Sequence, residues 1–285
     1  MDAESRSAAT DGTPLHYVTA GSGDPVLFLH GATLDHRMWD DQVAPFARHH
    51  RVVRCDLRGY GRSPRPTKRS PAPAEDVMAL LAHLGSAPVH VVGHSLGGAV
   101  AVDLALAHPE AVRSLTLVGA GLAGFPWATF GASLAHVRSV ARGHGLEEAR
   151  RAWLQNPLFA SAMERPPVAE RLERMVAAYS GWHWLNDPPR GAPSIDRLEG
   201  VAAPTLVLVG ARDLPDFQRV AETLHQRIPQ ASMVVMAEVG HMANMEDPER
   251  FDAIVLDFLR DPGWRRGANG PDPRPDTGGP RACAD

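Results

Sequence analysis

A serine lies between two glycines in the pentapeptide GHSLG at residues 93–97. This segment follows the apolar run VHVV and opens the helix-like stretch LGGAVAVDLALA. A serine at such a sharp strand-to-helix turn is pushed outward, next to the free N–H groups of a helix N-terminus, which suits attack on a carbonyl carbon. The alternative is an ordinary N-cap serine in a glycine-rich turn. The context predicts that Ser95 is a nucleophile.

A serine nucleophile requires a histidine base and a carboxylate that orients this base. His241 follows the apolar run at 233–237, and Asp213 follows the run at 205–209. The chain between them has room for one helix and one strand, so both loops can reach the same edge of a parallel sheet. We predict that His241 is the base and Asp213 the acid. Three other carboxylates remain as alternatives for the acid: Asp216, Glu238 and Asp187.

The segment HGAT at residues 30–33 follows another apolar run, VLFL. Acyl transfer through a tetrahedral intermediate needs two N–H donors that bind the oxyanion. One donor is expected from the residue after the nucleophile, Leu96, and the other from an early loop of this kind. We predict that Ala32 is the second donor, with Thr33 as the alternative. His30 is expected to form structural hydrogen bonds.

Short apolar runs alternate with amphipathic stretches along most of the chain. Runs rich in Val and Leu are typical of parallel strands that are buried on both faces. The pattern predicts an α/β fold, with a mostly parallel sheet and helices on both faces. The predicted strands are 15–20, 26–30, 51–56, 89–93, 114–118, 205–209 and 233–237. The predicted helices are 38–48, 74–84, 96–107, 216–227 and 248–260, and Asp247 is expected to cap the last of them.

The alternation stops between residues 122 and 200, where no convincing strand occurs. We predict that this stretch is a helical insertion between two strands of a core of residues 13–121 and 201–261. The polar segment 1–12 and the segment 262–285, rich in Pro and Gly, are predicted to be disordered. The predicted helices of the insertion are 133–142, 146–154 and 168–179. Four tryptophans of the insertion are candidates for the wall of a substrate pocket: Trp127, Trp153, Trp182 and Trp184.

Composition and charge exclude several classes of protein. The chain has 285 residues, a formal net charge of −4 and 44% hydrophobic residues, which argues against a nucleic-acid-binding protein. Without an apolar run of about 18 residues or a signal peptide, we expect a cytoplasmic protein that does not bind membranes. The histidines lack a metal-binding spacing, the glycines lack a dinucleotide-binding pattern, and Cys55 and Cys283 do not suggest a disulfide framework. We therefore expect no metal, no cofactor and a small molecule as the partner, while the oligomeric state stays open.

Five segments together resemble the α/β-hydrolase superfamily: HGATLDHRMWD, DLRGYGRS, GHSLGG, GARDLPD and GHMANMEDPERF. The resemblance covers residues 15–260, and the chain is similar to bacterial 3-oxoadipate enol-lactonases and related esterases. It implies that the insertion at 122–200 is a helical lid or cap over the active site, and that residues 56–63 have a structural role. Superfamily members that are dehalogenases or epoxide hydrolases use an aspartate nucleophile, so Ser95 argues against both activities.

These residues predict a serine hydrolase that cleaves a carboxylic ester or lactone of a small to medium apolar substrate through an acyl-enzyme. Two alternatives remain open. The same triad can hydrolyse thioesters or C–C bonds, or catalyse perhydrolysis without a cofactor. A receptor-like protein of this superfamily would instead bind a ligand with little turnover, although the complete set of three residues favours an enzyme.

Overall fold

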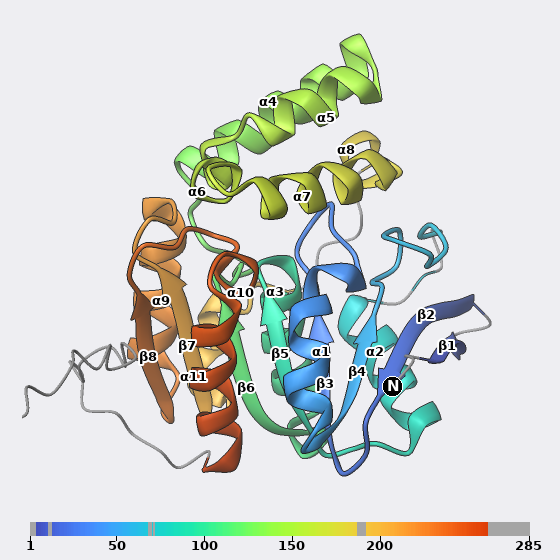
Figure 1. Cartoon of the computed structure of the whole chain (residues 1–285), viewed down its shortest axis with the longest axis vertical. Helices are drawn as coiled ribbons and strands as arrows, with labels where there is room; N and C mark the ends of the chain where they lie inside the picture. Colours follow the sequence, from blue (N-terminus) through green and yellow to red (C-terminus); the bar gives the residue numbers. More distant parts are fainter. Residues whose placement is uncertain (1–3, 11–12, 68–69, 71, 187–191, 262–285) are drawn as a thin grey trace, which may run out of the picture.

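The computed structural model describes residues 4–10, 13–67, 70, 72–186 and 192–261. In these residues, eight strands form one sheet in the order β1-β2-β4-β3-β5-β6-β7-β8 (Figure 1). The pairs β1–β2 and β2–β4 are antiparallel, and all other neighbours are parallel, so the predicted α/β fold is confirmed. The strands are β1 (Glu4–Thr10), β2 (Thr13–Ala20), β3 (Asp24–Leu29), β4 (His50–Cys55), β5 (Val89–His94), β6 (Val112–Val118), β7 (Thr205–Gly210) and β8 (Ala231–Met236).

Helices cover both faces of the sheet. In Figure 1, α1 and α11 pack together on the near face, while α2 and α3 lie behind the sheet. The last helix begins at Pro248, and the Asp247 side chain accepts a hydrogen bond from the N–H of Arg250 (3.3 Å), which confirms the predicted cap. The helices and 3₁₀ turns of the core are η1 (His36–Trp39), α1 (Asp40–Ala47), α2 (Pro73–Leu84), α3 (Leu96–Ala107), η2 (Pro109–Ala111), α9 (Pro215–Arg227), α10 (Ala243–Glu246) and α11 (Pro248–Arg260).

The N-terminal segment differs from the prediction, because β1 lies where the composition predicts disorder. It pairs with β2 from Glu4 opposite Thr19 to Thr10 opposite Thr13. Without this hairpin, β2 would be the edge strand of the sheet, with a row of unpaired N–H and C=O groups. Backbone pairing of this kind leaves no signal in the composition. The predicted disordered tail, 262–285, and Cys283 lie outside the described residues.

The central strands end where glycines allow helix α3 to approach the sheet closely. All residues of β5 and β7 are buried, as expected for parallel strands that are covered on both faces. A Cβ atom on Gly97 would lie 2.3 Å from the carbonyl oxygen of Leu29 at the end of β3. Only glycine therefore lets α3 begin directly against the carboxyl ends of β3 and β5.

A helical segment connects β6 to β7, and we call residues 122–200 the insertion. In Figure 1 its green and yellow helices lie above the sheet, at the end toward which the parallel strands point. The indole N–H of Trp153 in the insertion donates a hydrogen bond to Thr33 Oγ1 of the core (2.7 Å). None of the described helices is both long and apolar enough to cross a membrane. The insertion contains α4 (Thr129–His144), α5 (Leu146–Leu154), η3 (Pro157–Phe159), α6 (Ala160–Met163), α7 (Pro166–Ala178), α8 (Trp182–Leu185) and η4 (Ile195–Gly200).

A buried carboxyl group lies between α1 and α11. Asp252 of α11 is 7% exposed and accepts a hydrogen bond from Gln42 Nε2 of α1 (3.1 Å). Burial raises the pKa of Asp252 to about 7, although the hydrogen bond from Gln42 acts in the opposite direction. The unfolded chain ionises the same group near pH 3.9. Because the folded pKa is the higher one, Asp252 destabilises the fold progressively as the pH rises from about 4 to about 7.

We expect Asp252→Asn to raise the melting temperature, and to raise it more at pH 8 than at pH 5. Asparagine keeps an acceptor for Gln42 but cannot ionise, so the variant avoids the cost of a buried charge. Calorimetry at the two pH values measures the effect. Asp257→Asn is the control on the same helix, because Asp257 is half-exposed next to Arg260. Equal gains for the two variants, or a gain that does not depend on pH, would contradict the assignment.

Candidate active site

Ser95 lies at a strained turn between β5 and α3. Its φ of 50° and ψ of −113° fall where residues other than glycine are rare. The turn is held by two backbone hydrogen bonds, from the N–H of Ser95 to the carbonyl of Val118 (3.0 Å) and from the N–H of Gly121 to the carbonyl of Ser95 (2.8 Å). The strand-turn-helix context that the sequence predicts is therefore present. Strain of this kind is typical of functional positions.

The loops after β7 and β8 bring Asp213 and His241 together. Asp213 Oδ2 lies 2.8 Å from His241 Nδ1, and the two side chains are 0% and 1% exposed. A Cβ atom on Gly119, where φ is +46°, would lie 3.0 Å from His241 Nδ1, so this glycine leaves room for the pair. The carboxylate keeps the proton on Nδ1, which makes Nε2 the acceptor nitrogen. Among the described residues, Nε2 is buried and has no hydrogen-bond partner.

The alternative acids do not share this contact. Asp216 accepts a hydrogen bond from the N–H of Phe130 (2.8 Å) and pairs with Arg219. The side chain of Glu238 is exposed, and Asp187 lies outside the described residues. The geometry therefore favours Asp213 as the partner of His241.

Ser95 and His241 line a small recess together with Ala32 and His94. His94 Nε2 lies 2.9 Å from the carbonyl oxygen of His241, and the centroids of the two imidazole rings are 4.7 Å apart. Burial, helped by the neighbouring His241, lowers the pKa of His94 well below the ordinary value. A neutral His94 can thus donate from Nε2 and hold the backbone of His241 in place. Sequence reasoning missed this role.

The two predicted oxyanion donors, Ala32 and Leu96, line one cavity with Ser95. Leu96 is the first residue of α3, so its N–H has no acceptor within the helix. In the described part of the chain, neither N–H donates to another protein group. The Thr33 hydroxyl accepts the hydrogen bond from Trp153, and this contact leaves the Thr33 N–H as the alternative donor.

His30 makes two backbone hydrogen bonds at the base of this loop. Its Nε2 accepts from the N–H of Leu57 (2.9 Å), and its Nδ1 lies 2.8 Å from the carbonyl oxygen of Gly31. Burial lowers the pKa of His30, which suits a neutral ring with one donor and one acceptor nitrogen. These contacts agree with the predicted structural role.

A cavity of about 350 Å³ opens next to Ser95, between the core and the insertion. Three of the four predicted tryptophans line it, namely Trp127, Trp153 and Trp184. Trp182 does not line the cavity, whereas its neighbour His183 does. The prediction for Trp182 is therefore wrong, because the single turn of α8 directs Trp184 inward. Sequence reasoning also missed several lining residues: Tyr60, Leu134, Arg138, Tyr179, His183 and Phe217.

The polar part of the cavity wall is almost uncharged. The rings of Tyr60 and His183 stack with centroids 4.4 Å apart and planes 9° apart. Burial, followed by electrostatic interactions with His30 and Arg138, lowers the pKa of His183 to about 4, so its ring is neutral at pH 7. Burial also raises the pKa of Tyr60. Arg138 is then the one charged side chain among the described residues that line the cavity.

Glu246 of α10 holds the loop that carries His241. Its carboxylate accepts from the backbone N–H groups on both sides of the histidine, those of Gly240 (2.9 Å) and Met242 (3.1 Å). It also accepts from Ser161 Oγ in α6 (2.6 Å) and lies 3.2 Å from Arg165. The Glu246 side chain is 0% exposed. One carboxylate therefore connects the His241 loop to the insertion, which the sequence alone does not indicate.

A profile of the alpha/beta hydrolase fold family matches residues 24–248. The chain belongs to this family, and the resemblance found in its motifs is confirmed. A curated relative, the 2-hydroxy-6-oxononadienedioate/2-hydroxy-6-oxononatrienedioate hydrolase of Burkholderia vietnamiensis (strain G4 / LMG 22486), is 33% identical over 269 residues, which are 88% of this chain and 93% of the relative.

Two solved structures extend this comparison. The enol-lactonase from Burkholderia xenovorans LB400 has a TM-score of 0.80 and 27% identity, and the match covers 90% of this chain and 100% of that one. The esterase RhEst1 from Rhodococcus sp. ECU1013 has a TM-score of 0.79 and 26% identity, with coverage of 92% and 99%. The curated relative and the two solved structures are a hydrolase, an enol-lactonase and an esterase by name. Their matches cover 88–92% of this chain, so the similarity includes both the core and the insertion.

Proposed function

We propose that this protein is a serine hydrolase that cleaves a carboxylic ester or lactone of a small to medium apolar substrate. The observation that carries the proposal is the 2.8 Å contact between Asp213 and His241. Among the described residues, His241 Nε2 has no hydrogen-bond partner, and His241 lines the same recess as Ser95. The similarity to an enol-lactonase and an esterase supports the same class of substrate.

In the proposed mechanism, His241 Nε2 takes the proton of Ser95 as Oγ attacks the substrate carbonyl carbon. Asp213 stabilises the imidazolium that forms. The N–H groups of Ala32 and Leu96 bind the oxyanion of the tetrahedral intermediate. The alcohol leaves with the proton from His241, and an acyl ester remains on Ser95. Water, deprotonated by His241, then releases the acid and restores the serine hydroxyl.

The insertion acts as a cap in this proposal. The cavity has walls from the core, such as Phe217, and from the insertion, such as Trp184. An apolar cavity of about 350 Å³ suits an apolar acyl or alkyl group. We further propose residues 122–200 as the cap and residues 13–121 with 201–261 as the catalytic core.

Two neighbouring tryptophans allow a matched test of the cavity wall. Trp184 is 2% exposed and lines the cavity, whereas Trp182 lies two residues away and does not line it. We expect Trp184→Leu to change the ranking of acyl chain lengths by about 10–200-fold in kcat/KM, because an apolar wall discriminates by about 1–3 kcal/mol per methylene-sized mismatch. Rates on an acetate ester, whose acyl group is the shortest of the series, are expected to change least. If Trp182→Leu changes the ranking as much as Trp184→Leu, the wall is wrongly assigned.

Glu246→Gln is expected to weaken both the fold and catalysis. The amide nitrogen would face an N–H or hydroxyl donor, which leaves a buried group unsatisfied and costs about 1–3 kcal/mol of unfolding free energy. A displaced His241 loop would lower kcat by up to about 10²-fold. Denaturant unfolding and ester hydrolysis measure the two effects. Glu249→Gln, at an exposed position in the first turn of α11, is the control and is expected to change neither quantity.

Hydrolysis of a C–C bond is the second candidate function. It is favoured by the 33% identity to the 2-hydroxy-6-oxononadienedioate/2-hydroxy-6-oxononatrienedioate hydrolase. The same three residues can serve this reaction, so the choice of substrate separates it from ester hydrolysis. A panel of nitrophenyl esters, lactones and a 2-hydroxy-6-oxodienoate compares the kcat/KM values directly.

The first experiment is labelling with a fluorophosphonate, followed by turnover of this panel. The proposal requires one labelled serine per chain and many equivalents of product from an ester or lactone. Release that stops near one equivalent would favour a receptor-like protein. A kcat/KM that is highest for the dienoate would favour the C–C hydrolase.

A further inference from the structure

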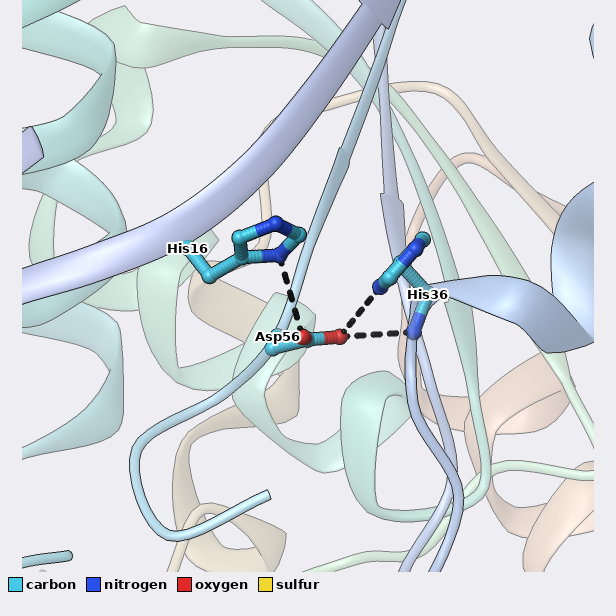
Figure 2. Close-up of side chains that lie close together, drawn as sticks. All are labelled: His16, His36 and Asp56. Carbon is cyan, nitrogen blue, oxygen red and sulfur yellow. Dashed lines mark hydrogen bonds and ion pairs between the residues drawn. The ribbon is translucent and has the colours of Figure 1, made fainter. Parts of the chain in front are cut away.

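Three side chains from separate elements converge at a position outside the cavity: His16 of β2, His36 of η1 and Asp56 after β4 (Figure 2). His16 Nδ1 lies 3.1 Å from Asp56 Oδ2, and His36 Nδ1 lies 2.8 Å from Asp56 Oδ1. The two imidazole ring centroids are 5.0 Å apart. One nitrogen or oxygen atom from each of the three side chains lies within 4.8 Å of the other two.

The fold holds the Asp56 carboxylate in one orientation. Oδ1 accepts from the backbone N–H of His36 and Oδ2 from that of Arg62, both at 2.8 Å. A Cβ atom on Gly61 would collide with the carboxylate, so glycine is needed there. The Asp56 side chain is 0% exposed, while His16 and His36 are 11% and 12% exposed. The carboxylate is thus fixed by the backbone, and each imidazole is partly exposed, although His16 Nδ1 itself is buried.

We propose that His16, His36 and Asp56 form a binding site for one divalent transition-metal ion, with Zn²⁺ as the ion of best fit. Two imidazole nitrogens and a carboxylate oxygen are ligands that Zn²⁺ binds at about 2.0–2.2 Å. Tetrahedral bonds of this length separate neighbouring ligand atoms by about 3.3 Å. The observed N···O distances, 2.8 Å to Oδ1 and 3.1 Å to Oδ2, are to different carboxylate oxygens, so the rings would shift to bring both Nδ1 atoms next to the oxygen that binds the ion. Water would take the fourth position.

The ligand set also selects among ions. Ca²⁺ and Mg²⁺ prefer sites made of oxygen ligands, whereas imidazole suits Zn²⁺ and its neighbours among the transition metals. A neutral imidazole that binds the ion through Nδ1 carries its single proton on Nε2, so each ring would hold the ion in this tautomer. The expectation of no metal site rested on sequence spacing. Sequence spacing does not reveal this cluster, because the three ligands meet only in the folded chain.

The site would join three parts of the core that are far apart in the sequence. His36 follows the loop that contains Ala32, and Asp56 precedes the loop that contains Tyr60. An ion held there would cross-link β2, η1 and β4, and would stabilise the folded chain by binding it and not the unfolded chain. The proposed hydrolytic steps do not involve the ion, so binding can be tested independently of activity.

Calorimetric titration of the tag-free full chain with Zn²⁺, after removal of metals with a chelator, tests the proposal. We expect one ion per chain and a melting temperature that rises with Zn²⁺ concentration but not with Ca²⁺. His16→Gln and His36→Gln are each expected to weaken binding at least about tenfold. His108→Gln is the matched control, because His108 also lies 3.0 Å from a carboxylate, that of Glu75, on the surface.

A crystal grown with Zn²⁺ gives a test that does not depend on variants. The anomalous difference map at the zinc edge is expected to show a peak at about 2.0–2.2 Å from both Nδ1 atoms. The proposal is overturned if no stoichiometric binding occurs, if both histidine variants bind as tightly as the unchanged chain, or if the peak lies elsewhere. In each of these cases the cluster is a hydrogen-bonded brace for Asp56 without an ion.

Discussion

Ser95→Ala is expected to lower kcat for ester hydrolysis by at least about 10⁴-fold and to abolish labelling by a fluorophosphonate. The loss is large because nucleophile, base and acid act as a unit, so removal of one member removes nearly the whole contribution of the three. Alanine keeps a Cβ atom at the strained φ of 50°, so the turn between β5 and α3 is expected to persist. Steady-state kinetics and mass spectrometry of the labelled chain measure the two effects.

Ser139→Ala provides the matched control for this variant, since Ser139 is an exposed serine of α4. It is expected to keep full labelling and full activity. If the Ser95→Ala chain is still labelled at another serine and still turns over, the nucleophile lies elsewhere. An unchanged melting temperature would show that a loss of activity in Ser95→Ala does not come from unfolding.

Asp213→Asn is expected to lower kcat by about 10⁴-fold, with little change in structure. The carboxylate now keeps the proton of His241 on Nδ1, 2.8 Å away. An amide can donate its own N–H to Nδ1 and so stabilise the other tautomer, in which Nε2 carries the proton. Nε2 then cannot accept the proton of Ser95. Kinetics on the best ester of the panel measures the loss.

Asp216→Asn is the matched comparison, because Asp216 is also a buried aspartate at the start of the neighbouring helix α9. It contacts the N–H of Phe130 and Arg219 but not His241. Its replacement is therefore expected to cost far less activity than Asp213→Asn and to lower mainly the melting temperature. The opposite ranking of the two variants would transfer the role of the acid to Asp216.

The positions of Ser95, Asp213 and His241 were predictable because parallel strands impose a simple rule. Each residue follows an apolar run that reads as a buried strand, and the carboxyl ends of such strands meet at one edge of the sheet. Chain order and strand ends were sufficient to bring Asp213 to His241, as the structure has it. The same rule placed both Ala32 and Leu96 at the cavity.

Other features depend on contacts for which no local pattern exists. The single turn of α8 contains Trp182 and Trp184, and four residues are too few for periodicity to indicate which one is buried. Strand β1 forms by backbone pairing with β2, which its composition does not reveal. Glu246 acts through backbone N–H groups and a serine that is 85 positions away. Such contacts are set by tertiary packing and not by propensity.

The hydrogen bonds between the insertion and the core determine how the two could be exchanged among relatives. Trp153 donates to Thr33 in the loop that contains Ala32, and Ser161 donates to Glu246 next to His241. A chimaera that receives a foreign insertion without matching partners at these positions would leave the Thr33 hydroxyl without its donor. It would also remove the Ser161 hydroxyl and the Arg165 cation from the Glu246 carboxylate, which holds the His241 loop. Engineering of new substrate preferences by insertion swapping should therefore transfer residues 33 and 246 together with the foreign helices.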